Sequence, residues 1–233
     1  MRLVRIAVVS DIHGNLLALE AVLKDLDQVR ADSVVLGGDL ALGGPHPNEV
    51  VDRLRALGWP SVLGNTDEAL DESKLPAQAR GGFVAPAAAR TREMLGPERV
   101  AWLTRLPLEW QRDAVSVVHA TPTDCWAIVA HDAADGELRE VYKRPVIDSA
   151  VYGHIHHAFV RDLGGFTVAN SGSVSLSLDG DVRACYAVVE EGRVEHRRVP
   201  YDVEKVAVDM EAIGYPNAIR YGAWLRSGAF PTQ

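Results

Sequence analysis

Five short apolar segments, spread over the first two thirds of the chain, each end directly at side chains that can bind a metal ion. The side chains that follow them are, in chain order, Asp11 and His13, Asp39, Asn65, His119, and His154 and His156. Parallel strands of an open α/β sheet place their carboxyl ends at one edge, which is where such sheets form their sites. The pattern therefore predicts that these seven side chains converge from distant parts of the chain.

The segments between the first of these side chains alternate between strand and helix patterns. Strands are predicted at residues 3–9, 33–36 and 61–63, and amphipathic helices at residues 15–30 and 47–57. An alternation of strand and helix is typical of a parallel α/β sheet.

The middle and the end of the chain follow other patterns. Residues 68–106 are rich in Ala and Arg and predict helices over one edge of the sheet, as a lid-like segment. The remaining strands are predicted at residues 115–118, 150–152, 158–161, 167–169, 183–189 and 194–199, and the remaining helices at residues 132–142, 203–213 and 218–225. Because no repeat or low-complexity linker interrupts the sequence, residues 1–233 are predicted to form a single domain, with its C-terminal helices within about residues 202–227.

Carboxylate and imidazole side chains in one site are typical of a hydrolytic centre that binds two divalent ions. Asp39 is the candidate bridge, since two ions about 3.5–4 Å apart need a shared ligand and a carboxylate can span both. In an extended segment, Asp11 and His13 would point the same way, and so would His154 and His156.

Glycines precede three of the predicted ligands, at Gly38, Gly64 and Gly153. A residue without a Cβ lets the backbone turn tightly beside a metal or a phosphate. Taken singly, each motif has an ordinary explanation, because Gly-Asp and Gly-Asn are common in turns. All five motifs in order, each after a predicted strand, favour a metal site instead.

The order Asp-x-His, Gly-Asp, Gly-Asn, His and Gly-His-x-His resembles the calcineurin-like metallophosphoesterase superfamily over residues 6–156. Residues 10–18, 44–51, 170–187 and 199–202 are similar to the small prokaryotic phosphoesterases of that superfamily. The resemblance implies a mixed α/β (α+β) fold, a four-layer sandwich of two mixed β-sheets flanked by helices.

The resemblance also implies how two metal ions would be held. One ion would take Asp11, His13, Asp39 and His156, and the other would take Asp39, Asn65, His119 and His154. A hydroxide that bridges the metals would attack phosphorus, so that no protein base is required. Manganese is the first expectation for both ions, with iron, zinc and nickel as alternatives.

The third motif departs from the superfamily, which commonly has a histidine after Asn65 that protonates the leaving oxygen or steadies the phosphate. Here Thr66 follows; it cannot act as an acid near neutral pH, although it can donate one hydrogen bond. We therefore expect a preference for good leaving groups, such as aryl or diphosphate esters, unless another acid such as His46 takes over. Asp39, Asn65, Thr66 and Asp67 form the predicted catalytic group, with Asp67 either supporting the ligands from behind or lying at the surface.

Composition limits the partners and the compartment. A net charge of −8 excludes a broad electrostatic nucleic-acid binder, and no apolar stretch reaches the roughly 20 residues of a membrane helix. Two cysteines without a CxxC pair, and an N-terminal apolar run too short for a signal sequence, predict a cytoplasmic protein. The expected partner is a small phosphoester, with nucleotides among the candidates. Aromatic residues near the C-terminus, Tyr215, Tyr221 and Trp224, suggest a homo-oligomeric contact.

Two other functions remain alternatives at this stage. One is a catalytically weakened scaffold on the phosphoesterase fold, which Thr66 supports. The other is a nucleotide-binding protein that responds by moving residues 68–106. Metal-stimulated turnover of phosphoesters would separate the enzyme from both.

Overall fold

The computed structural model describes residues 4–230, so Leu3, where the first strand was expected to begin, lies outside the described residues. One sheet has four strands in the order β2-β1-β8-β9. Its members are β1 (Arg5–Val9), β2 (Ser33–Leu36), β8 (Ala184–Glu190) and β9 (Arg193–Val199). β1 and β2 run parallel, whereas β8 pairs antiparallel with both β1 and β9, so the sheet is mixed.

The second sheet has five strands in the order β3-β4-β5-β7-β6. Its members are β3 (Glu109–Arg112), β4 (Val115–Val118), β5 (Ser149–Tyr152), β6 (Phe159–Asp162) and β7 (Thr167–Asn170). The three central strands are parallel, and the two edge strands are antiparallel to their neighbours. This sheet is therefore mixed as well.

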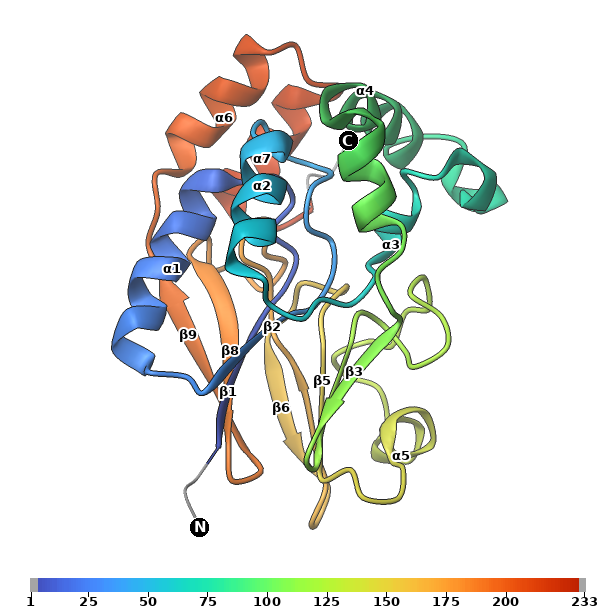
Figure 1. Cartoon of the computed structure of the whole chain (residues 1–233), viewed down its shortest axis with the longest axis vertical. Helices are drawn as coiled ribbons and strands as arrows, with labels where there is room; N and C mark the ends of the chain where they lie inside the picture. The colour runs from blue at the N-terminus through green and yellow to red at the C-terminus, as the bar shows by residue number, and fades with distance from the viewer. Residues whose placement is uncertain (1–3, 231–233) are drawn as a thin grey trace.

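The two sheets pack face to face through a shared apolar core that includes Ile6 and Val8 of β1 and, opposite them, Val117 of β4 and Val151 of β5. Five helices share a core with the other face of the four-stranded sheet: α1 (Leu16–Val29), α2 (Pro47–Leu57), α4 (Val84–Leu103), α6 (Val203–Ala212) and α7 (Ala218–Ser227). α5 (Asp135–Tyr142) packs on the five-stranded sheet, on the opposite side of the molecule from α1 (Figure 1). The predicted four-layer sandwich is confirmed. Within residues 4–230, none of the helices has the length and apolar character needed to cross a bilayer.

Helix ends follow the local sequence. α1 begins after Asn15, whose side chain accepts a hydrogen bond from the Ala18 amide at 3.0 Å, as a capping residue does. α2 begins with Pro47 in its first turn, where the missing N–H costs no hydrogen bond. These caps fix where the loops that carry Asp11 and Asp39 end and the helices α1 and α2 begin.

The structure differs from the prediction in three places. The strand expected at residues 61–63 is a single bridge between Leu36 and Ser61. The Val62 amide donates to the Leu36 carbonyl, but the next amide on that side, that of Gly64, donates to the Asp67 carboxylate instead of to β2. Residues 68–106 contain two short 3-10 turns and α4, which is kinked at Gly96 before a proline. β3 was not predicted, since its residues show no clear alternation.

An ion pair between Asp179 and Arg198 ties the loop after β7 to β9. Burial by itself would raise the pKa of Asp179, but hydrogen bonds from Arg198 and Ser177 lower it to about 2. Because the folded pKa lies below the unfolded one, this stabilisation is complete above about pH 4 and is lost as the pH falls toward 2.

Asp179→Asn is therefore expected to lower the free energy of unfolding by about 1–2 kcal/mol at neutral pH. Urea unfolding of the variant and the parent at several pH values measures this difference, which should shrink toward zero in acid. The exposed pair of Asp52 and Arg99 offers the control, since Asp52→Asn should change little at any pH. A pH-independent loss in Asp179→Asn would contradict the ion-pair explanation.

Candidate metal centre

Six of the seven predicted ligands follow the carboxyl ends of strands. Asp11 and His13 come after β1, and Asp39 comes after β2. In the other sheet His119 follows β4, and His154 and His156 follow β5. Asn65 begins the short helix α3 (Asn65–Glu68), after the bridge at Ser61. Because the two sheets face each other, these loops meet at one end of the sandwich.

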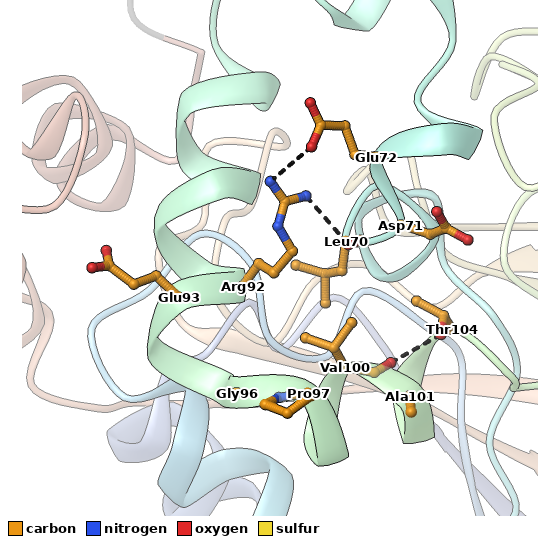
Figure 2. Close-up of a pocket in the computed structure, with 10 residues that line it drawn as sticks. All are labelled: Leu70, Asp71, Glu72, Arg92, Glu93, Gly96, Pro97, Val100, Ala101 and Thr104. Atoms are coloured by element: carbon orange, nitrogen blue, oxygen red, sulfur yellow. Dashed lines mark hydrogen bonds and ion pairs between the residues drawn. The ribbon is translucent and has the colours of Figure 1, made fainter.

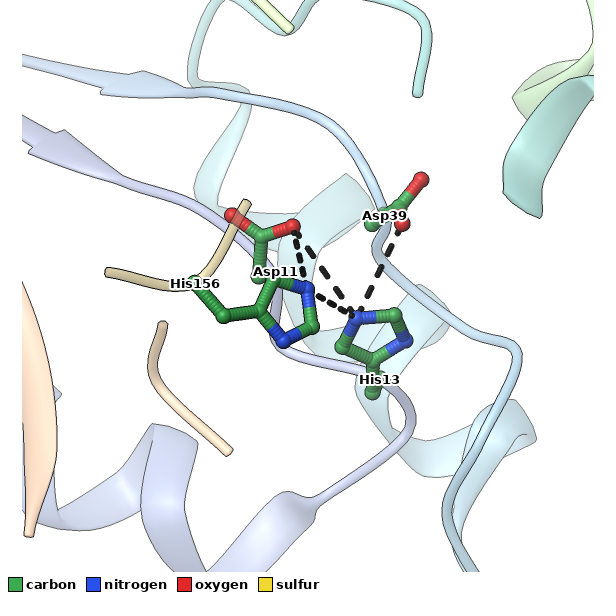
Figure 3. Close-up of side chains that lie close together, drawn as sticks. All are labelled: Asp11, His13, Asp39 and His156. Carbon is green, nitrogen blue, oxygen red and sulfur yellow. Dashed lines mark hydrogen bonds and ion pairs between the residues drawn. The ribbon is translucent and has the colours of Figure 1, made fainter. Parts of the chain in front are cut away.

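Four of these side chains form a compact group: Asp11, His13, Asp39 and His156 each offer one donor atom, and these atoms lie within 4.8 Å of one another. Figure 3 shows the four side chains pointing toward a common centre. The His156 Nε2 atom lies 3.0 Å from Asp11 Oδ1, and the His13 Nε2 atom lies 3.7 Å from Asp39 Oδ2. This is a donor set that a divalent transition-metal ion prefers.

Asn65 joins the remaining two histidines into a second group. Its Oδ1 atom lies 2.9 Å from His119 Nε2 and 2.9 Å from His154 Nδ1. Asp39 lies between the groups, because its Oδ1 atom is 3.4 Å from His119 Nε2 while its Oδ2 atom faces His13. The structure thus brings together all seven predicted residues, with Asp39 adjacent to both groups.

Backbone carbonyls hold three of the histidine rings by their Nδ1 atoms. The pairs are His13 with Leu42, His119 with Gly37, and His156 with Leu176. A carbonyl can only accept a hydrogen bond, so each Nδ1 carries a proton and, in the neutral ring, each Nε2 presents a lone pair to the centre. Metal-bound histidines are oriented in the same way.

With these tautomers, acceptor atoms face one another. The Nε2 atoms of His13 and His156 are 3.2 Å apart, and His119 Nε2 faces the Asn65 oxygen at 2.9 Å. Two lone pairs at such distances repel each other unless a cation neutralises them. The donor set therefore fits bound divalent ions.

The surroundings of His13, His154 and Asp11 keep these three groups in their metal-binding protonation states. Burial lowers the pKa of His154 to about 4 and also lowers the pKa of His13. Burial opposes ionisation of Asp11, but the adjacent His156 outweighs it and holds the pKa of this carboxyl well below its usual range. At neutral pH the imidazoles of His13 and His154 and the Asp11 carboxylate are therefore ready to bind a cation.

The Asp-x-His and His-x-His motifs are not extended, so that expectation was wrong. Asp11 and His13 have φ values of 57° and 50°, and His154 and His156 have values of 66° and 53°. Asp39 shares this left-handed conformation, with φ of 56°. Such backbone costs roughly 1–2 kcal/mol per residue. Five of the seven predicted ligands therefore occupy strained positions, as residues at functional sites often do.

The three glycines let the backbone pass close to the side chains of predicted ligands. A Cβ on Gly64 would lie 2.1 Å from Asp39 Oδ1, and one on Gly153 would lie 2.5 Å from Asp11 Oδ2. A Cβ on Gly38 would lie 2.8 Å from His119 Nδ1. All three contacts are far shorter than side chains tolerate, so the ligands can approach the backbone only because it lacks side chains there.

Asp67 is fully buried, so surface placement was wrong. Its carboxylate accepts hydrogen bonds from the backbone amides of Asp39 at 2.8 Å, Leu40 at 3.0 Å and Gly64 at 3.2 Å. Burial, together with repulsion from Asp39, raises its pKa to about 7. Asp67 thus fixes the loops that carry Asp39 and Asn65.

A cavity of about 250 Å³ adjoins the metal centre. Its polar residues are His13, Asp39, Asn65, Thr66, His154 and His156, and its apolar residues are Leu42, Phe83, Val84, Leu176, Tyr221, Trp224 and Phe230. Sequence reasoning missed the apolar side and assigned the aromatic residues near the C-terminus to a self-contact. Tyr215, Tyr221 and Trp224 are instead buried within the chain, which corrects that assignment.

Two other candidates lie away from the cavity. His46, considered as a replacement acid, does not line it, and its Nε2 atom lies 3.4 Å from Asp209 Oδ2. A wider hollow of about 690 Å³ lies at the kink of α4, where Arg92 binds Glu72 and the Leu70 carbonyl (Figure 2). None of the predicted ligands lines that hollow. The functional site is therefore assigned to the smaller cavity.

The model of the calcineurin-like phosphoesterase superfamily domain matches residues 4–193, which include every one of these ligands. The chain belongs to this superfamily. The chain is 31% identical over 224 residues to an uncharacterized protein of Methanocaldococcus jannaschii, covering 86% of this chain and 89% of that protein. It also matches the crystal structure of a metallophosphoesterase from Sphaerobacter thermophilus, with 28% identity and a TM-score of 0.78, over 98% of this chain and 100% of the other.

A further relative has a named substrate. The symmetrical bis(5'-nucleosyl)-tetraphosphatase of Nitrosococcus oceani is 29% identical over 145 residues, which cover 59% of this chain and 51% of that protein. The match therefore spans about half the length of the tetraphosphatase.

Proposed function

We propose that this chain hydrolyses phosphate esters with two divalent ions bound at the strand ends. Asp11, His13, Asp39 and His156 would hold one ion, and Asp39, Asn65, His119 and His154 would hold the other. When bound, such ions supply Lewis acidity toward phosphoryl oxygens and acidify water. The observation that carries the proposal is the ring of acceptor atoms facing one another, with Asp39 between the two groups.

The chain's own residues would orient the substrate. The polar residues that line the cavity form its floor and direct a phosphate toward the predicted ligands. The apolar residues form its wall and exclude water from the ester. Thr66 lines this cavity, and its buried Oγ1 atom has no hydrogen-bond partner among residues 4–230. Its hydroxyl is free to donate a hydrogen bond to a phosphoryl or leaving oxygen.

A panel of phosphomonoesters and phosphodiesters, assayed with manganese, iron, zinc and nickel, tests this function. Metal analysis of the purified protein should find two ions per chain. Hydrolysis that depends on added metal supports the proposal. Metal binding without turnover of any ester would favour the scaffold or nucleotide-binding alternatives. Manganese as the preferred ion, a cytoplasmic location and a homo-oligomeric state stay predictions from the sequence.

Thr66→His is expected to raise kcat for alkyl phosphates by roughly 10²-fold, because a histidine can protonate a poor leaving group. Aryl phosphates need little protonation and should gain much less. Thr66→Gln is the matched control, since it fills similar space without a group that titrates near neutral pH. Comparing kcat for an alkyl and an aryl ester in the three proteins measures the effect. Equal gains from His and Gln would contradict an acid role for the new side chain.

A further inference from the structure

The cavity beside the metal centre has two unlike sides. All of its polar lining belongs to the predicted ligands and Thr66. The opposite side is apolar and is built largely from aromatic rings on distant segments: Phe83, just before α4, Tyr221 and Trp224 on α7, and Phe230 beyond it. A substrate that lies with its phosphate on the floor must therefore place its ester group against aromatic side chains.

The four rings form a continuous packed surface. Phe83 and Tyr221 have ring centroids 4.4 Å apart, and Trp224 and Phe230 have centroids 5.0 Å apart. Trp224 also stacks on the predicted ligand His156 at 5.7 Å, so the aromatic side reaches the metal centre itself. Aromatic rings of this kind favour another ring packed offset or edge to face.

The residues described on the aromatic side of the cavity carry no charge that could hold a second phosphate. Among residues 4–230, no Lys or Arg lines the cavity. The guanidinium of Arg220 lies over the rings of Phe83 and Phe230, at 5.2 and 4.9 Å from their centres, without lining it. Burial raises the pKa of Tyr221, so its hydroxyl stays neutral. An additional anionic group placed there would lose its water without gaining a partner.

The volume of the cavity also favours a small substrate. Pockets for drug-sized ligands usually measure roughly 300–1,000 Å³, whereas this cavity measures about 250 Å³. It suits a phosphate with one compact group attached and is too small to enclose a dinucleoside polyphosphate.

We propose that the substrate is a phosphate ester of a compact, uncharged aromatic alcohol, whose ring packs against Phe83, Trp224 and Phe230. This inference rests on the proposed function and narrows it. Between the aryl and diphosphate esters that Thr66 left open, the cavity selects the aryl ester and rejects the diphosphate. It also separates this chain from the substrate named for its tetraphosphatase relatives.

Phosphonates that cannot be hydrolysed test ring recognition without the influence of leaving-group ability. Calorimetry on the manganese-loaded protein would compare methylphosphonate, phenylphosphonate and 4-carboxyphenylphosphonate. Phenylphosphonate should bind roughly tenfold more tightly than methylphosphonate, because the ring buries apolar surface. The carboxylated ring has the same size and should lose most of that advantage.

Variants test whether the preference for phenylphosphonate depends on the aromatic side of the cavity. Phe230→Ala should reduce the tenfold preference for the ring to about threefold or less. Ile219→Ala removes an exposed side chain of α7, 79% accessible, and should leave the preference unchanged. Phe230→Lys should reverse the ranking of the two aromatic phosphonates, because it introduces a cation at the wall.

The possible outcomes distinguish failure of the proposed substrate class from failure of the proposed hydrolytic function. Equal affinity for methylphosphonate and phenylphosphonate, or undiminished affinity for the carboxylated ring, would overturn the substrate class while metal-dependent hydrolysis stands. Absence of turnover with every ester would overturn the proposed function and the substrate class together.

Discussion

Asp39→Asn should reduce metal-dependent hydrolysis of an aryl phosphate by roughly 10³-fold or more, while the chain stays folded. The Asp39 side chain faces both ligand groups, with one oxygen 3.4 Å from His119 Nε2 and the other 3.7 Å from His13 Nε2. Asparagine keeps the shape and one oxygen but removes the negative charge that two cations would share. Losing several kcal/mol of charge stabilisation corresponds to a rate loss of that size.

Two readouts make this result interpretable. Thermal unfolding should show that manganese raises the Tm of the parent protein but not that of the variant, because a ligand stabilises only the state that binds it. Asp25→Asn is the matched control, since Asp25 pairs with Arg197 on another face and does not line the cavity. Retained activity in Asp39→Asn would contradict a shared carboxylate at this position.

Gly64→Ala is expected to damage the site as severely as Asp39→Asn does, although it alters none of the predicted ligands. The added methyl would lie 2.1 Å from Asp39 Oδ1 and 2.2 Å from the Asp39 amide nitrogen, and the backbone atom cannot rotate away. The loops that carry Asp39 and Asn65 must then separate. We expect a loss of about 3 kcal/mol in the free energy of unfolding, together with loss of metal binding.

Gly136→Ala provides the comparison. A Cβ at this position meets nothing within 4 Å, and the residue lies inside α5, so alanine should stabilise the chain by roughly 0.5–1 kcal/mol. Urea unfolding and manganese titration of both variants measure the two effects. Normal manganese affinity in Gly64→Ala would show that the close approach to Asp39 is not needed.

The convergence of the seven predicted ligands could be predicted because their positions depend on local features. A strand followed by a polar residue can be read from a short window, and the direction of parallel strands then places the ends together. The left-handed backbone of Asp11, His13 and Asp39 could not be predicted in this way. Non-glycine residues adopt that conformation only when tertiary contacts hold them there, and such contacts come from distant segments.

The spacing of the aromatic residues near the C-terminus was assigned to the wrong partner. Tyr221 and Trp224 are three residues apart and share one face of α7, which indicated an apolar contact but not its partner. The partner is the chain's own metal centre, since Trp224 stacks on His156. Long-range packing of this kind leaves no trace in spacing, so the cavity wall could not be predicted.

Except for Phe83, the aromatic rings of the cavity lie on α7 and at Phe230, three residues beyond the end of α7, and all of these follow the last predicted ligand in the chain. The matched family domain ends at residue 193, before α7 begins at Ala218. Under the proposed function, the predicted metal ligands and most of the aromatic side of the cavity thus lie in separate parts of one polypeptide. A change in the C-terminal helix would then alter which alcohols fit while every predicted metal ligand stays in place.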